Sequence, residues 1–203
     1  MAADVTVPAG ERVLVLLRAV NVGGTGALPM ADLRAAATGL GHTDVATHLA
    51  TGNLLLAPAP GSPGTVDALS ARLAEDLTAA LGRSLTLTVR TRAQLDAVVA
   101  ANPYPAEAAA DPARLTVVFW DGDVPQGPLD LSRYGRERGT VRCREGYVHY
   151  PDGIGRSKVT GAVLDRLAAP GGTARNWRTV RALHGLLGAA RPVDPRDGRS
   201  PGG

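Results

Sequence analysis

Cysteine, aromatic residues and long apolar runs are scarce in this sequence. Cys143 is its only cysteine, which excludes an intramolecular disulfide and a zinc site built from several cysteines. The apolar run 13–17 lies between Arg12 and Arg18 and is far too short for the apolar part of a signal peptide or for a membrane span. We therefore expect a location in the bacterial cytoplasm and no membrane partner.

The few aromatic residues, 3% of the chain, mean that the core must be built from Leu, Val and Ala. Hydrophobic residues make up 44% and charged residues 20%, as in ordinary globular proteins. A formal net charge of +3 permits an anionic partner without requiring one. The densest basic run, RYGRERGTVRCR at 133–144, is more typical of a solvated hairpin than of a nucleic-acid groove, so nucleic acid is the less favoured partner.

Recognised catalytic and metal-binding patterns are also missing. The histidines, at 42, 48, 149 and 184, show no metal-ligand spacing, and the acids at 121, 123 and 152 have no evident pairing. No GxSxG elbow, dinucleotide fingerprint or P-loop occurs. Cys143 lies in an arginine-rich strand without a helix start or a partner, so we expect a buried structural thiol. We expect no metal site, and the sequence specifies no cofactor.

Apolar periodicity in the first half predicts alternating strands and helices. The run 12–18 is typical of a buried central strand, and 65–81 carries one apolar helix stripe that ends at Gly82. The other expected elements are a helix from Pro29 to Leu40 and strands over 45–50, 53–58 and 85–90. The order β-α-β-β-α-β is that of the ferredoxin-like unit, so the expected fold class is α+β.

The second half predicts another α+β unit packed on the first. Thr91 should cap a short helix over 92–100, and the proline-rich stretch 101–112 should be a linker or functional loop. Further expected elements are a strand over 114–121, a hairpin turning at Glu145-Gly146, and helices over 157–167 and 177–187. The expected organisation is a disordered segment 1–11, halves at 12–91 and 92–188, and a disordered tail 189–203.

Lysine is nearly absent, since Lys158 is the only lysine among 22 cationic residues. It follows two glycines in the stretch YPDGIGRSKV, and Ser157 is a suitable cap for a helix that begins there. Lys158 would then lie in the first helical turn, where the helix dipole favours anions. An anion bound by the helix N–H groups and the ammonium would explain this placement. The alternative is a surface lysine retained by chance.

The stretch LLRAVNVGG at 16–24 is a second candidate. A buried strand there delivers Arg18 and Asn21 into a loop, where Gly23 and Gly24 could bring backbone N–H groups close to a ligand. The alternative is an ordinary strand-to-helix loop that uses glycine for its turns.

Two shorter polar stretches complete the candidates. In ATGN, Thr51 and Asn53 bracket a glycine at a turn between strands, where they could bind a polar ligand or form a tight turn only. In TARNWRTV, Arg175, Asn176 and Trp177 open the last expected helix. They could contact a ligand, or Trp177 could anchor the core beside a helix cap.

Seven motifs resemble the bacterial family called domain of unknown function 1697. They are LLRAVNVGG, PMADLR, TGN, NPYP, VVFW, YPDGIGRSK and TARNWRTV, in that order across about residues 12–187. Ala19-Val20 replaces the family's usual Gly-Ile, and Thr51 replaces its usual Ser. The resemblance implies an α+β fold with tandem ferredoxin-like units, and it supplies no function.

The resemblance also implies that the polar motif residues share a ligand site. Carried over to this chain, those positions are Arg18, Asn21, Gly23, Gly24, Thr51, Asn53, Asn102, Ser157, Lys158, Arg175, Asn176 and Trp177.

Two functions from different classes follow. In the first, a loop-built cleft binds a small anionic ligand such as a nucleotide: Lys158 and Arg175 hold the phosphate, and Trp177 stacks on the base. Any catalysis would rest on electrostatic stabilisation by Lys158 and Arg18. The second is a nucleic-acid or protein-binding module without catalysis. The absence of aromatic residues from the central strands counts against RNA recognition on a ferredoxin-like sheet.

Overall fold

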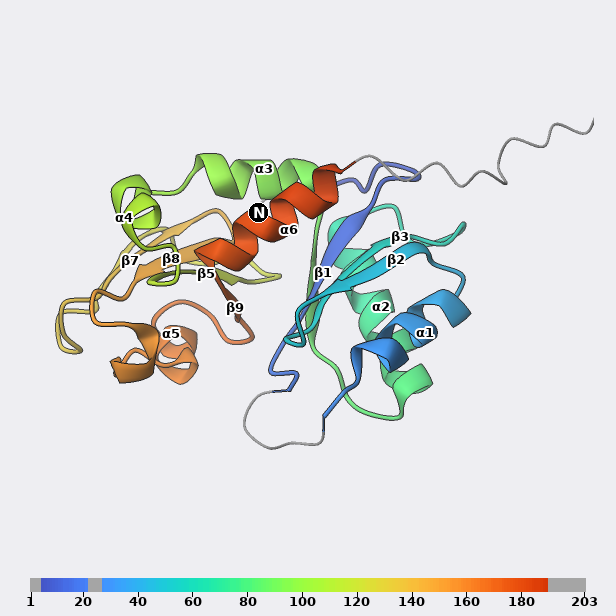
Figure 1. Cartoon of the computed structure of the whole chain (residues 1–203), viewed down its shortest axis with the longest axis horizontal. Helices are drawn as coiled ribbons and strands as arrows, with labels where there is room; N and C mark the ends of the chain where they lie inside the picture. The colour runs from blue at the N-terminus through green and yellow to red at the C-terminus, as the bar shows by residue number, and fades with distance from the viewer. Residues whose placement is uncertain (1–4, 22–26, 190–203) are drawn as a thin grey trace, which may run out of the picture.

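The computed structural model describes residues 5–21 and 27–189, which form two antiparallel sheets with helices on their faces (Figure 1). The expected α+β class is confirmed. The first half contains β1 (Val13–Leu17), α1 (Met30–Gly39), β2 (Thr43–His48), β3 (Asn53–Ala57), α2 (Val66–Leu81) and β4 (Leu87–Arg90). Its strands lie in the order β2-β3-β1-β4, and its elements follow the expected β-α-β-β-α-β order.

β1 is buried at every position because both faces of the first sheet are covered. Val13, Val15 and Leu17 face α1 and α2, whereas Leu14 and Leu16 face the second half of the chain. A strand covered on one face only would alternate apolar and polar residues, so double coverage explains the continuous apolar run. The two halves therefore share a core, and their division at residue 91 stays a prediction.

The second half contains α3 (Arg92–Ala100), α4 (Pro105–Ala110), β5 (Leu115–Phe119), β6 (Gly127–Leu129), β7 (Arg138–Arg142), β8 (Glu145–His149), a 3-10 helix (Ile154–Arg156), α5 (Gly161–Leu167), β9 (Thr173–Asn176) and α6 (Trp177–Gly188). Its sheet has the order β6-β7-β8-β5-β9. Helices α3 and α6 pack on one face and α5 on the other (Figure 1). Among the described helices, none is long and apolar enough to cross a membrane.

Helix ends are well explained by local sequence. The hydroxyl of Thr91 accepts the backbone N–H of Gln94 at 3.2 Å, and the Gln94 side chain accepts the N–H of Thr91 at 2.9 Å. This capping box confirms the expected start of α3. Gly82 ends α2 with a φ of 62°, in the left-handed region that glycine adopts without strain.

Three expectations for the second half need correction. The stretch 101–112 is not only a loop, because Pro105 begins α4, at a position where a missing N–H costs no hydrogen bond. The β7–β8 hairpin turns between Arg142 and Glu145, since Glu145 and Gly146 belong to β8 and already pair with β7. Residues 173–176, expected at a helix start, form the edge strand β9 against β5.

The N-terminal segment is more ordered than expected. Val7 donates its N–H to the carbonyl of Gly64, and Val66 donates to the carbonyl of Val5, both at 2.8 Å. Residues 5–7 are thus held beside the start of α2, because these bonds pair them with residues 64–66. The expected disorder of 1–4 and 190–203 falls outside the described residues.

We expect His42 to make the fold less stable in mildly acidic solution. Its side chain is buried, its Nδ1 accepts the N–H of Ala59 at 3.0 Å, and its Nε2 has no partner among the described residues. Burial lowers the pKa of His42 below the ordinary 6.5, so the unfolded chain binds the proton more tightly. Stability is therefore complete above about pH 6.5 and falls as the pH drops below it, by at most about 1.4 kcal/mol per pH unit.

Denaturant unfolding at a series of pH values measures this effect. His42→Asn is the matched variant, because the amide oxygen can accept the N–H of Ala59 and cannot titrate. The variant should lose less stability than the native chain between about pH 6.5 and pH 5. Identical pH profiles for the two proteins would show that His42 is not responsible.

Candidate functional site

Arg175 on β9 joins the second half of the chain to the end of β1. Its Nε donates to Oδ1 of Asn53 at 2.5 Å. Its Nη2 donates to the carbonyls of Leu17, Thr51 and Gly52 at 2.9, 3.1 and 3.1 Å. Buried and exposed positions alternate along β9, which turns the Arg175 side chain inward. The predicted stretches TGN and TARNW therefore meet in space.

The Arg175 guanidinium is a buried charge whose contacts are all neutral. Besides the groups above, its Nη1 donates to Oγ1 of Thr173 at 3.0 Å and to the carbonyl of Ala174 at 2.8 Å. Burial lowers the pKa of Arg175 to about 10, which leaves it protonated at neutral pH. Its five N–H groups all have acceptors, so the guanidinium fixes this junction and has no donor left for a ligand.

The TGN turn is likewise occupied by internal hydrogen bonds. Asn53 is completely buried, and its Nδ2 donates to the carbonyl of His48 at 2.8 Å and to the Thr51 hydroxyl at 3.2 Å. Gly52 has a φ of 76°, and a Cβ added there would lie 2.8 Å from the Cβ of Leu17. The glycine therefore allows the turn to approach β1, as a tight turn requires.

Asn21 closes the loop that follows β1. Its Nδ2 donates to the carbonyls of Ala50 at 2.7 Å and Leu28 at 3.0 Å, and its Oδ1 accepts the N–H of Leu28 at 2.7 Å. These bonds hold the two described ends of the loop together across residues 22–26. Gly23 and Gly24, the predicted sources of backbone N–H groups, lie outside the described residues.

Arg18 is the half-exposed cation of this region and pairs with Asp165 of α5 at 2.8 Å. We call the group around the end of β1 the strand-end junction. Its members are Arg18, Asn21, Thr51, Asn53 and Arg175. The structure thus brings together five of the predicted site residues, and their polar groups chiefly bind one another and the backbone.

Ser157 and Lys158 lie elsewhere on the second half. The hydroxyl of Ser157 donates to Glu137, next to β7, and accepts the N–H of Val159 at 3.0 Å. Strands β8 and β5 separate β7 from β9, so this contact is remote from Arg175 in the sheet. Lys158 is exposed, and its side chain has no hydrogen bond or ion pair within the part of the chain that the structure describes.

The expected helix start at Ser157 is wrong. The 3-10 helix Ile154–Arg156 ends there, and α5 begins only at Gly161, after Thr160. Lys158 is therefore in the bend before the helix. The predicted placement of Lys158 in the first helical turn is therefore wrong.

The remaining three predicted residues serve local structure. Oδ1 of Asn102 accepts the N–H of Tyr104 at 2.9 Å, in the link between α3 and α4. Oδ1 of Asn176 accepts the N–H of Thr179 at 2.8 Å, which confirms it as the cap of α6. Trp177 is 7% exposed and packs in the core between the sheet and its helices, so little of its ring is available for stacking on a base.

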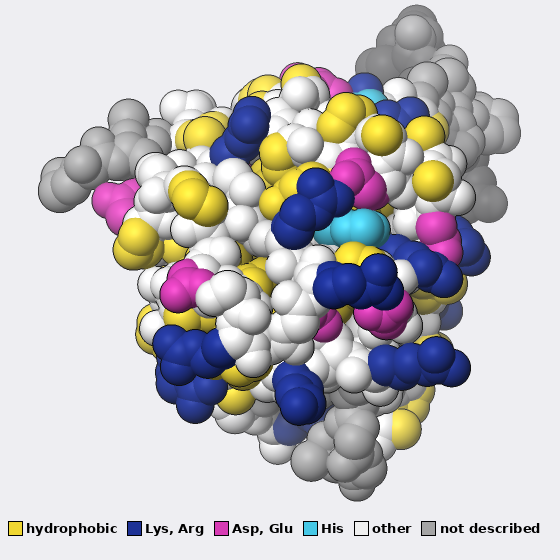
Figure 2. All heavy atoms as spheres, turned by 90° about the vertical axis from the view of Figure 1, so that its left-hand side faces the viewer, with side chains coloured by type: hydrophobic (Ala, Val, Ile, Leu, Met, Phe, Trp, Pro, Cys, Tyr) yellow, Lys and Arg dark blue, Asp and Glu magenta, His cyan; other side chains and the backbone are white. Residues whose placement is uncertain are grey.

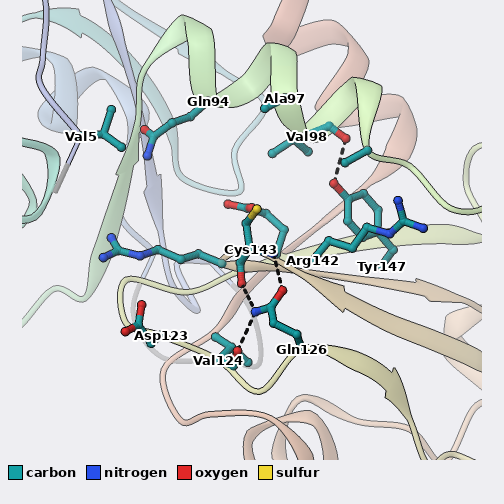
Figure 3. A pocket seen from close by; sticks show the side chains of 13 residues that line it. Val5, Gln94, Ala97, Val98, Asp123, Val124, Gln126, Arg142, Cys143 and Tyr147 are labelled. Carbon is teal, nitrogen blue, oxygen red and sulfur yellow. Dashed lines mark hydrogen bonds between the residues drawn. The ribbon is translucent and has the colours of Figure 1, made fainter. Parts of the chain in front are cut away.

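A cleft of about 620 Å³ lies between α3 and the β7–β8 hairpin (Figure 3). We call it the α3–hairpin cleft. Its lining consists of Val5, Gln94, Ala97, Val98, Ala101, Asp123, Val124, Gln126, Arg142, Cys143, Arg144, Glu145 and Tyr147. None of the predicted site residues is among them, although its volume is typical of small-molecule sites.

Hydrogen bonds inside the cleft hold its walls in place. Nε2 of Gln126 donates to the carbonyl of Cys143 at 2.8 Å, and its Oε1 accepts the N–H of the same residue at 2.7 Å (Figure 3). The Tyr147 hydroxyl donates to the carbonyl of Val98 at 2.8 Å. Burial raises the pKa of Tyr147, so its hydroxyl stays protonated and ties the sheet to α3.

The charged groups of the cleft differ in their availability. Arg144 binds Asp67 through two contacts of 2.5 and 3.0 Å, and Glu145 pairs with the buried Arg90 at 2.8 Å. Arg142 is exposed, and its side chain has no hydrogen bond or ion pair with any described residue. Arg142 is therefore the lining cation that a ligand can reach without breaking an existing pair.

Cys143 is exposed, which corrects the expectation of a buried thiol. It occupies the hairpin turn with a φ of 54°, between two strands rather than within one. The described residues contain no group of three or more His, Cys, Asp or Glu side chains that could hold a metal ion.

Sequence reasoning missed the α3–hairpin cleft because its walls come from separate segments that carry no shared motif, at residues 94–101, 123–126 and 142–147, together with Val5. The one available signal was the dense basic run, which contributes Arg142, Cys143 and Arg144. Its reading as a hairpin is confirmed, and the hairpin forms one wall of the cleft.

Comparisons with known proteins agree with this fold. The sequence profile described as "Protein of unknown function (DUF1697)" matches residues 11–148. No curated protein matches the chain. Among solved structures, the chain is similar to conserved bacterial protein SP0830 from Streptococcus pneumoniae, with a TM-score of 0.58 and 21% identity. That match covers 87% of this chain and 98% of the other, and at this identity it shows the fold alone.

Proposed function

We propose that this chain, which belongs to the DUF1697 family of proteins of unknown function, binds a small ligand with an apolar body and an anionic group in the α3–hairpin cleft. One observation carries the proposal: a cavity of about 620 Å³ has an exposed arginine, Arg142, that no acid neutralises within the described residues. The proposal concerns binding, and no reaction is assigned to the cleft.

The apolar part of the ligand would lie against α3. Ala97 and Ala101 are one helical turn apart, and Val98 lies beside them on the cleft wall. Small side chains at these positions leave space between the helix and the hairpin, with Val124 on the opposite side (Figure 3). An apolar group placed there would gain about 25 cal/mol for each Å² removed from water.

The anionic part would bind Arg142. Its side chain extends toward Tyr147 and away from Asp123, which lies across the cleft (Figure 3). A guanidinium with free N–H groups offers two parallel hydrogen bonds to a carboxylate or phosphate. Arg144 and Glu145 are each already in an ion pair, so they contribute more to the shape of the cleft than to its charge.

The proposal thus retains the anionic ligand inferred from the sequence but assigns it to the α3–hairpin cleft instead of the predicted motif residues. The strand-end junction remains the alternative place, where Arg18 is half-exposed. It is less favoured because Arg175 and Asn53 have no free hydrogen-bonding groups for a ligand.

We expect Arg142→Ala to weaken ligand binding and Ala97→Trp to abolish it. A panel of aliphatic carboxylates, nucleotides and sugar phosphates is screened by thermal shift, since a ligand of the native state raises the unfolding midpoint. Loss of a charged hydrogen bond of about 1.5–3 kcal/mol should weaken a hit by roughly tenfold to a hundredfold. The bulky indole of Ala97→Trp should fill the cleft and leave no room for the apolar group.

Arg181→Ala is the matched control, because Arg181 is an exposed arginine of α6 that does not line the cleft. It should bind every hit as the native chain does. A hit that survives Arg142→Ala and Ala97→Trp but is lost in Arg18→Ala or Lys158→Ala would instead place the site among the residues predicted from sequence. Failure of every compound to shift the native midpoint would contradict the proposal.

A further inference from the structure

One segment of the second half, residues 133–158, is rich in positive charge. Residues 133–158 contain seven cationic residues and three acidic ones, a net charge of +4, whereas the whole chain has a formal net charge of +3. The segment spans the loop before β7, the β7–β8 hairpin and the 3-10 helix. Figure 2 shows Lys and Arg side chains across the lower part of the face on this side of the molecule.

Ion pairs compensate part of the charge of this segment and leave several cations free. Arg138 and Arg144 pair with acids outside the segment, Glu107 and Asp67. Within it, Asp152 pairs with Arg136, and Glu137 accepts the hydroxyl of Ser157. These two contacts also tie the loop before β7 to the segment after β8. In contrast, the side chains of Arg156 and Lys158 are exposed and have no hydrogen bond or ion pair with described residues. The surface therefore presents charge that is not already compensated.

An aromatic ring accompanies the arginines. The Arg133 guanidinium lies 5.7 Å from the centre of the half-buried Tyr134 ring. The Arg138 guanidinium lies 5.2 Å from the centre of the Tyr104 ring, but that ring is buried and adds little to the surface. Planar guanidinium groups beside aromatic rings are suited to unstacked bases, which a purely acidic peptide lacks. This combination favours a nucleic acid over an acidic protein.

We propose that this basic surface, formed by Arg133, Tyr134, Arg136, Arg138, Arg156 and Lys158, binds the backbone of single-stranded nucleic acid. The cations lie on loops, a 3-10 helix and a strand end, and none lies on a long helix that could enter a duplex groove. Loops with separate cations fit a flexible strand, whose phosphates can adjust to them. Lys158, whose side chain has no hydrogen bond or ion pair with described residues, is then a point charge for a phosphate.

The test is the salt dependence of binding to a fluorescently labelled oligouridine, measured by anisotropy. Each phosphate contact contributes about 0.7 to the slope of log K against log salt for a single strand. The double variant Arg156→Ser/Lys158→Ser should therefore have a slope smaller by about 1.4. Between about 50 and 200 mM salt, the native chain should lose about sevenfold more affinity than this variant.

The matched control is Arg178→Ser/Arg181→Ser, which removes the same charge from exposed positions of α6. It should keep the native slope, and unfolding midpoints should show that both double variants fold. Equal loss in the two variants would indicate a non-specific charge effect and overturn the proposal. So would the absence of binding at the lowest salt concentration, or equal competition by polyglutamate. Because Arg142 is unchanged in both variants, the result is independent of the α3–hairpin cleft.

Discussion

Arg175→Ala should lower the free energy of unfolding by about 4 kcal/mol, because it leaves the buried Oδ1 of Asn53 and the partly buried carbonyl of Thr51 without a donor. The carbonyls of Leu17 and Gly52 lose one bond each but keep the Thr173 hydroxyl and the N–H of Leu17, respectively, as donors. The guanidinium serves Oδ1 of Asn53 and the carbonyls of Leu17, Thr51 and Gly52 at once. Each buried acceptor that loses its partner costs about 1–3 kcal/mol, reduced where water can enter the space. Since these groups lie where the two halves meet, the loss should affect the whole fold.

Urea unfolding of the native chain, Arg175→Ala and Arg175→Lys measures this effect. Lysine retains the positive charge but lacks the planar guanidinium, so it can donate to fewer acceptors. The stability of Arg175→Lys should therefore lie between those of the native chain and Arg175→Ala. The control is Arg178→Ala, three residues later on the exposed side of α6, which should unfold like the native chain. A loss below about 1 kcal/mol for Arg175→Ala would mean that water replaces the guanidinium at little cost. Arg175 would then not be required for the fold, and the predicted contact between its guanidinium and a ligand would again be a candidate role.

Arg175 also shows why the candidate site was only partly predictable. Its motif gave the right neighbourhood, since TGN and TARNW do meet. The type of element was predicted wrongly. Four mostly polar residues before a helix resemble a helix cap, and nothing in the local sequence shows that they form a strand paired with β5. Strand pairing is decided by residues far apart in the sequence, and here it turns a charged side chain inward rather than toward solvent.

The best-predicted elements are those whose signal is local. α2 has one apolar stripe and a glycine stop, and α3 has a capping box, so neither depends on the rest of the chain. α4 was missed because prolines were interpreted only as breaks, although Pro105 suits a first helical turn. The α3–hairpin cleft had only the dense basic run as a local signal, because it arises where small residues of a helix face a hairpin.

Lys158 is a second residue whose surroundings could not be predicted from the local sequence. The anion contact predicted for it relied on a helix that begins at residue 157, whereas α5 begins four residues later, at Gly161. What the structure shows is an exposed ammonium without a described partner, beside paired acids. Lys158 is therefore better considered as part of the surrounding charged surface than as part of an anion site at a helix start.

The second large effect is expected at Arg90, the other buried arginine between the halves. From β4 it donates to Glu145 at 2.8 Å and to the carbonyl of Trp120 at 2.6 Å, and its guanidinium lies 5.7 Å from the Phe119 ring centre. Arg90→Met would leave the buried carboxylate of Glu145 without its cation. Removing one partner of a buried ion pair costs about 3–5 kcal/mol, so we expect a loss of about 4 kcal/mol.

A double-mutant cycle separates this penalty from the value of the pair itself. Arg90→Met/Glu145→Leu removes both charges, so it should be more stable than Arg90→Met alone even though it carries one more substitution. Urea unfolding of the native chain, both single variants and the double variant supplies the cycle. The exposed pair Arg92 and Asp96 provides the control, since Arg92→Met should cause no measurable loss. If the two single losses simply add in the double variant, the pair is not coupled, and Arg90 stabilises the junction through its carbonyl contacts and Phe119 instead.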